Sequence, residues 1–115
     1  MKGVGIDIEE IARFERMYLK KPRLIKRLFS DYEWEYALKK VKPHQTLAGI
    51  WCAKEAVVKA FSNTEILSIK DINIVHSKNG APKVKILKTK LNQKYEVHIS
   101  ISHSKQQATA IAILT

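Results

Sequence analysis

The chain has 115 residues and a formal net charge of +10 at pH 7, so one domain is expected, with an acidic partner. A hydrophobic content of 45% excludes a disordered chain. The single cysteine, Cys52, excludes a disulfide framework and a multi-cysteine metal site. We find no signal peptide and no apolar stretch of membrane-spanning length, so we expect a cytoplasmic protein without a membrane partner.

The first elements expected are a strand and two short helices. Apolar β-branched residues alternate with small or polar ones over 4–8, which predicts a strand with Asp7 on the face opposite the apolar side chains. Apolar residues recur at helical spacing over 11–18, and Pro22 ends or kinks this helix. Another turn or two of helix is predicted over 24–28.

Two further helices follow. Ser30 and Glu33 have the spacing of a capping box, which predicts a helix that runs towards Val41. Pro43 separates it from the longest predicted helix, over about 44–61. Apolar side chains cover most of the circumference of this longest helix, so we expect it to be buried.

The second half of the chain is expected to form antiparallel strands, over 69–75, 83–87, 95–102 and 108–114. The sequence NGAP at 79–82 predicts a turn between the first two. A hairpin around 103–107 would hold His103 at its turn. One strand, then helices, then antiparallel strands predicts an α+β fold, in a single domain over residues 1–115.

Four polar residues stand out at positions where chemistry is possible: Asp7, Glu55, Lys59 and His103. Two carboxylates can hold one Mg²⁺, a lysine can neutralise phosphate charge or protonate a leaving group, and a histidine can orient or deprotonate a hydroxyl. Each also has an ordinary structural interpretation. Asp7 can cap the following helix, Glu55 and Lys59 can form a solvated i,i+4 pair, and His103 can be a turn residue.

Several common sites are excluded by their missing motifs. The chain has no glycine-rich phosphate loop, no CxxC or HExxH zinc motif and no GxSxG nucleophile elbow. Between residues 16 and 30 basic side chains cluster without any acidic residue. This segment is either a solvated helix face or a surface for an acidic partner.

Three segments resemble the motifs of one family. GVGIDIEEIARFE is similar to an N-terminal motif in which an arginine follows an aspartate six residues later. WCAKEAVVKAF resembles the motif (F/W)xxKEAxxKA, and ISISHSKQQATA resembles a Ser-Ile-(Ser/Thr)-His strand end. The family is that of the holo-acyl-carrier-protein synthases, the small phosphopantetheinyl transferases. The resemblance covers the whole chain with the motifs in order.

The resemblance implies a reaction and roles for the four residues. Phosphopantetheine would move from coenzyme A to a serine of apo acyl carrier protein, with release of 3′,5′-ADP, as a step of fatty acid biosynthesis. Asp7 and Glu55 would bind Mg²⁺ together with pyrophosphate oxygens of coenzyme A. Lys59 would lie beside the pyrophosphate and His103 near the coenzyme A phosphates. These four residues are the expected catalytic set.

The resemblance also implies two further sets of contacts and an assembly. Besides Lys59 and His103, the coenzyme A contacts would be Lys42, Asn79, Gly80 and Pro82. The carrier-docking residues would be Arg13, Met17, Lys20, Arg23 and Arg27. The working form would be a homotrimer with active sites between neighbouring subunits.

The chain departs from the family pattern around the nucleotide. Ile50 stands where most members carry arginine, Lys42 lies in an unusual Lys-Pro context, and SNTE at 62–65 replaces a Gly-Thr-Gly loop. Two alternatives to the enzyme stay open. A small basic nucleic-acid-binding module would explain the charge but not the four polar residues. A catalytically idle carrier-binding protein would dock the carrier without turnover.

Overall fold

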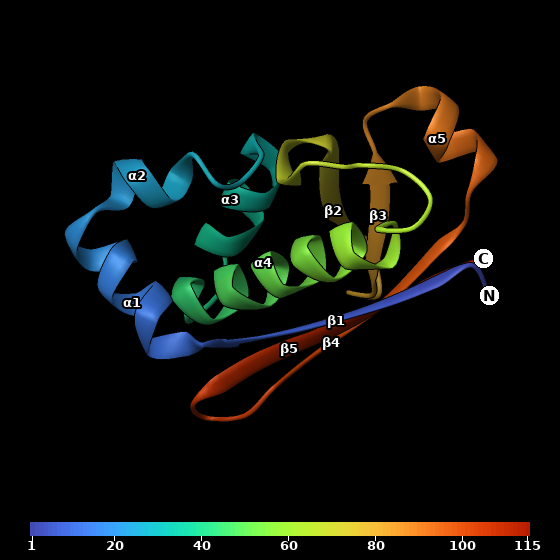
Figure 1. Cartoon of the computed structure of the whole chain (residues 1–115). Coiled ribbons are helices and arrows are strands. Elements are labelled where there is room, and N and C mark those ends of the chain that lie inside the picture. The colour runs from blue at the N-terminus through green and yellow to red at the C-terminus, as the bar shows by residue number, and fades with distance from the viewer.

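The structure, a computed structural model, describes residues 1–115 and confirms the α+β class (Figure 1). Its elements are β1 (Gly3–Glu10), α1 (Ile11–Lys20), α2 (Pro22–Lys26), α3 (Asp31–Leu38), α4 (Pro43–Ala60), a 3₁₀ turn (Ile69–Asp71), β2 (Ile72–His76), β3 (Pro82–Ile86), α5 (Thr89–Lys94), β4 (Val97–His103) and β5 (Gln107–Leu114). The strands form two antiparallel sheets, ordered β1-β5-β4 and β2-β3. None of the helices combines the length and apolar character needed to cross a membrane.

The long helix α4 packs closely against the three-stranded sheet. A Cβ atom at Gly5 would overlap the carbonyl oxygen of Ala56, and one at Gly3 would overlap that of Ala60. The two glycines therefore let the backbone of β1 approach α4 directly. On β5 the residues that face the helix are small, and the thiol of Cys52 donates a hydrogen bond of 3.3 Å to the Ala108 carbonyl. This close packing fixes α4 against β1.

The predicted alternation in β1 is confirmed, but the apolar side of the strand is open. Val4, Ile6 and Ile8 are 52%, 63% and 58% exposed. Gly5 and Asp7 instead point towards α4, because only small or polar side chains fit between the strand and the helix at this distance. The open side continues onto β5, where Ile111 is 37% exposed. One face of the sheet is therefore covered by α4, and the other carries exposed apolar residues.

The four predicted helices agree approximately with the structure except at the end of α3, and α5 was not predicted. The capping box is present: Ser30 Oγ accepts from the Glu33 N–H at 3.1 Å, and Ser30 N–H donates to Glu33 Oε1 at 2.8 Å. The helix ends at Leu38, so the prediction that it runs towards Val41 is wrong. The residue before a proline is disfavoured in helical geometry, and Lys42 is indeed non-helical (φ −124°, ψ 84°), so the chain leaves the helix before Pro43.

Candidate active site

Asp7 and Lys59 meet at the contact between β1 and α4. The Lys59 Nζ lies 3.3 Å from Asp7 Oδ1 and donates a hydrogen bond of 2.9 Å to the Ile6 carbonyl. The lysine thus turns towards the strand, and the surface pair with Glu55 one turn earlier does not form. The second oxygen of Asp7, Oδ2, is buried and has no hydrogen-bond partner. A buried carboxylate oxygen without a partner is costly, so this position is suited to a bound cation or donor.

Two more carboxylates belong to the same edge of the molecule. Glu55 is half-buried on α4 and makes no ion pair. Glu9 lies two residues after Asp7 on the same side of β1, and its Oε1 lies 3.0 Å from Arg13 Nη1. Burial raises the pKa of Glu9 above its ordinary value, and the negative charges of Asp7 and, more weakly, Glu55 raise it further. The three carboxylates therefore repel one another in a partly desolvated place.

This edge fits a divalent cation such as Mg²⁺. The orphaned oxygen of Asp7 and the unpaired carboxylate of Glu55 are hard oxygen ligands. No group of three His, Cys, Asp or Glu side chains lies close enough to hold a metal ion alone. Mg²⁺ commonly takes one or two carboxylates and completes its coordination with water and substrate phosphate. Two protein ligands are thus compatible with the predicted metal, which stays a prediction.

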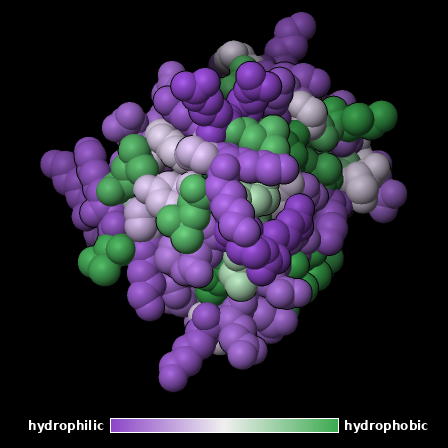
Figure 2. All heavy atoms as spheres, turned by 90° about the vertical axis from the view of Figure 1, so that its left-hand side faces the viewer, coloured by the Kyte–Doolittle hydropathy of each residue, from purple (hydrophilic) through white to green (hydrophobic).

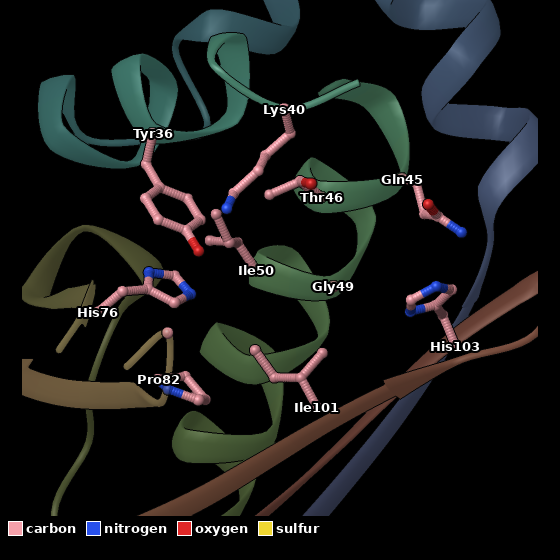
Figure 3. A pocket seen from close by; sticks show the side chains of 11 residues that line it. Tyr36, Lys40, Gln45, Thr46, Gly49, Ile50, His76, Pro82, Ile101 and His103 are labelled. Atoms are coloured by element: carbon pink, nitrogen blue, oxygen red, sulfur yellow. The ribbon is translucent and has the colours of Figure 1, made fainter. Parts of the chain in front are cut away.

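A cavity of about 220 Å³ lies on another side of α4 (Figure 3). It opens between the end of α3, the first half of α4, the β2–β3 turn and the end of β4. Gly80, Pro82 and His103, three residues expected near the nucleotide, line it together. Ile50 lines it as well, so the departure from the family pattern falls directly on its wall.

The cavity and the Asp7–Lys59 pair lie on opposite faces of α4. Ile50 and Lys59 are nine positions apart, which is about two and a half helical turns. The two regions also lie beside different strands of the sheet. His103 ends β4 and Asp7 lies on β1, and these are the two outer strands. Asp7, Glu55 and Lys59 do not line the cavity. Within one chain, the four expected catalytic residues are thus split into a group of three and His103.

Comparison with known proteins identifies the family. Residues 3–113 match the family described as the 4′-phosphopantetheinyl transferase superfamily. The chain belongs to this family. It is 40% identical over 121 residues to holo-[acyl-carrier-protein] synthase from Alkaliphilus metalliredigens, with 100% of this chain and 99% of that protein covered.

Solved structures of phosphopantetheinyl transferases share the fold. The Helicobacter pylori holo-[acyl-carrier-protein] synthase in complex with coenzyme A matches with a TM-score of 0.82 at 31% identity, covering 97% of this chain and 99% of that one. The holo-(acyl-carrier-protein) synthase from Bacillus anthracis, in complex with CoA (3′,5′-ADP), matches with a TM-score of 0.76 at 31% identity, covering 98% and 95%. The resemblance noted in the sequence is therefore confirmed, together with the fold class.

Besides Lys59, two of the expected coenzyme A contacts, Asn79 and Lys42, lie outside the cavity wall. Asn79 builds the turn after β2, because its Oδ1 accepts from the Ala81 N–H at 3.1 Å and from the Ser77 hydroxyl. Gly80 next to it has a φ of 87°, which favours glycine. Lys42 lies at the start of α4 and lines a different hollow beside His44. Both residues stay predicted contacts.

The expected carrier-docking residues lie on α1 and on the α2 segment. Arg13, Lys20, Arg23 and Arg27 are exposed, and Met17 is half-buried. On the face that carries α1 and α2, hydrophilic side chains predominate and hydrophobic patches lie between them (Figure 2). Leu19 and Leu24, 72% and 48% exposed, belong to these two helices. The segment thus presents a basic surface with apolar side chains.

Lys54 has a structural role, and the sequence did not indicate its partner. It is 2% exposed, and its Nζ donates to Glu33 Oε1 at 2.7 Å. Glu33, fully buried, also accepts from the N–H groups of Ser30 and Ile74. The capping box had located Glu33, but no local pattern indicates a lysine 21 positions later as its partner. The adjacent Lys54 and Glu55 therefore serve the core and the candidate site, respectively.

Proposed function

We propose that this protein is a holo-acyl-carrier-protein synthase that transfers phosphopantetheine from coenzyme A to a serine of apo acyl carrier protein. The observation that carries the proposal is the buried, unpartnered oxygen of Asp7 beside Glu55 and Lys59 in a member of the phosphopantetheinyl transferase family. The coenzyme A bound to the related H. pylori enzyme supports the choice of donor.

The reaction is a single phosphoryl-type transfer. The serine hydroxyl oxygen of the carrier attacks the phosphorus that bears the pantetheine group. A new P–O bond forms there, and the bond from this phosphorus to the bridging oxygen breaks. The electron pair stays with the bridging oxygen on the leaving 3′,5′-ADP, and the hydroxyl proton passes to a base or to water.

Each residue of the β1–α4 edge has a distinct role in this proposal. Asp7 and Glu55 would hold Mg²⁺, which when bound neutralises the charge of the pyrophosphate. The ammonium group of Lys59 would neutralise charge on the leaving phosphate. Its hydrogen bond to the Ile6 carbonyl orients the lysine side chain. The rigid contact between β1 and α4 keeps the carboxylates and the lysine in place, as a positioned site requires. His103 would orient the hydroxyl or accept its proton.

The active site is proposed to lie between subunits of a homotrimer. The three residues of the β1–α4 edge and His103 face different sides of α4 in one chain. A neighbouring copy could supply the missing side. The exposed apolar face of β1 and Ile111 on β5 offer a surface that symmetric association would cover. Both features support a shared site.

The partner is proposed to be an acidic carrier protein, bound by the basic surface of α1 and α2. Net charge and the acid-free basic segment favour it. The proposed setting is the cytoplasm, in fatty acid biosynthesis. The nucleic-acid alternative has no support in the family or in the fold, since Phe14, Trp34 and Phe61 are buried rather than free to stack on bases.

The decisive experiment is an incubation of the purified protein with coenzyme A, MgCl₂ and an apo carrier, followed by intact mass measurement. We expect the carrier mass to rise by one phosphopantetheine group and 3′,5′-ADP to appear in equal amount. Omission of the metal, with a chelator present, should abolish both changes. A carrier that binds the protein but keeps its mass would instead establish the idle binding protein.

A further inference from the structure

The cavity beside α4 has a wall without negative charge. Eleven residues line it, and none of them is acidic. Its side on α4 is formed by uncharged residues, namely Gln45, Thr46, Gly49 and Ile50. Any positive charge that the cavity offers to a ligand must therefore come from other elements. The residues that can carry one are Lys40, His76 and His103.

Lys40 is held at the cavity by a stack of aromatic rings. Its Nζ lies 4.6 Å from the ring centroid of Tyr36, a cation–π distance. Tyr36 in turn stacks on His76, with centroids 3.8 Å apart and planes at 5°. Tyr32 fixes the end of β2, because its hydroxyl accepts the His76 N–H at 3.0 Å. Figure 3 shows the Lys40 amine reaching inward between Tyr36 and Ile50.

The charge of Lys40 is available to a ligand. The lysine forms no ion pair within the chain. His76 does not share the role of a permanent cation, because burial lowers its pKa and the neighbouring charge of Lys40 lowers it further. His103 extends from the end of β4 on the far side of the cavity (Figure 3). Lys40 is therefore the one permanently charged side chain of the wall.

We propose that Lys40 recognises a phosphomonoester in this cavity and that, in the proposed reaction, this group is the 3′-phosphate of coenzyme A. The assignment rests on the proposed function for the identity of the ligand. A phosphomonoester dianion matches a half-enclosed site with an unpaired ammonium and no acid. In this chain Lys40 would thus supply, from the segment that follows α3, the cation that Ile50 cannot supply from α4.

The test compares coenzyme A with dephospho-coenzyme A, which differ only in the 3′-phosphate. Binding to the full chain is measured by calorimetry in the presence of MgCl₂ and without carrier. We expect Lys40→Met to lower the affinity for coenzyme A by roughly 10- to 100-fold, which corresponds to the loss of one charge-assisted hydrogen bond. The affinity for dephospho-coenzyme A should be unchanged. Lys40→Arg should keep most of the preference, since it keeps the charge.

Lys39→Met is the matched control. Lys39 is the exposed neighbour that ends α3, and it does not line the cavity. Its loss should leave both affinities unchanged. Equal affinities of wild-type protein and Lys40→Met for coenzyme A would overturn the inference. So would a parallel loss for both ligands, or a wild-type protein that binds neither.

The two proposals fail in different ways. If the wild-type protein modifies the carrier but Lys40→Met retains its preference for coenzyme A over dephospho-coenzyme A, the role of Lys40 is refuted and the transferase stands. If Lys40 controls that preference but no carrier is modified, the phosphomonoester site stands and the transferase is refuted.

Discussion

The two faces of α4 are built by different means. On the β1 face, two glycines bring strand and helix backbones together, and Asp7 and Lys59 contact each other directly. On the cavity face, side chains from helix ends, a turn and a strand end surround an open space. The first face leaves little room for substitution, whereas the cation proposed for the second face, Lys40, comes from the segment after α3 rather than from α4. In the proposed function, the closely packed face would carry the chemistry and the open face would bind part of the ligand, with α4 between them.

The sharpest way to break the β1 face is Glu55→Gln. The change keeps the shape of the side chain and removes a negative charge from the proposed cation site, so transfer should fall by ~10³-fold or more. Mg²⁺-dependent turnover measures the loss, and circular dichroism should show an unchanged fold. Glu35→Gln, an exposed residue of α3, is the matched control. Near-normal turnover of Glu55→Gln would return Glu55 to a structural role.

The relation between the two faces is tested by combining two inactive chains. His103→Ala should lower turnover by ~10²-fold if the residue is a general base. When this chain is co-expressed with Glu55→Gln, a site shared between subunits is intact in about one quarter of cases, by random pairing in a symmetric ring. Activity should therefore recover to about that fraction.

A site built within one subunit gives the opposite result, because every chain then carries one defect. Mixed preparations would stay as inactive as the separate variants. Sedimentation of the wild-type protein provides the assembly state independently. A stable and fully active monomer would contradict both the homotrimer and the shared site.

Lys54→Met should affect the fold rather than the chemistry. It leaves the buried carboxylate of Glu33 without its ammonium, which should cost about 3–5 kcal/mol of unfolding free energy. Denaturant unfolding measures the loss. The double change with Glu33→Gln should lose less than the sum of the single changes, since it removes both charges. A single variant of wild-type stability would show that the pair does not stabilise the core.

The smallest expected effect concerns the carrier surface. Arg13 forms an ion pair with Glu9, so changing it would also disturb the candidate site. The double variant Arg23→Glu with Arg27→Glu avoids this effect. It should raise the carrier KM by roughly 10-fold through weaker electrostatic attraction and leave the KM of coenzyme A unchanged. Lys85→Glu with Lys90→Glu, on exposed positions elsewhere, matches the charge change. Equal effects of the two double variants would show that carrier binding depends on the net charge of the protein rather than on this surface.

Much of the fold was predictable because it depends on local patterns. Apolar spacing indicated α4, the NGAP turn indicated the β2–β3 hairpin, and the capping box located the start of α3. The helix α5 was missed, and so was the pairing of β1 with β5, which joins the two ends of the chain. Alternation shows that Val4 and Asp7 face opposite sides but does not show which side is covered. That choice depends on the close approach of α4 at Gly5.

The candidate site was predictable to a similar degree. The motifs located Asp7, Glu55, Lys59 and His103, but their order along the chain carries no information about the faces of α4. The role of Lys40 was also hidden, because its significance depends on Tyr36 and His76 from separate elements. Such arrangements are set by tertiary packing rather than by periodicity.

The buried thiol of Cys52, at the contact between α4 and β5, can report on transient opening of this contact. Burial raises the pKa of Cys52 to about 12, and neighbouring carboxylates contribute. At neutral pH the sulfur is therefore both shielded and protonated, and an alkylating reagent can attack it only after helix and sheet separate. Because Cys52 is the sole cysteine, the rate of its labelling would measure how often α4, the helix between the two parts of the candidate site, separates from the sheet.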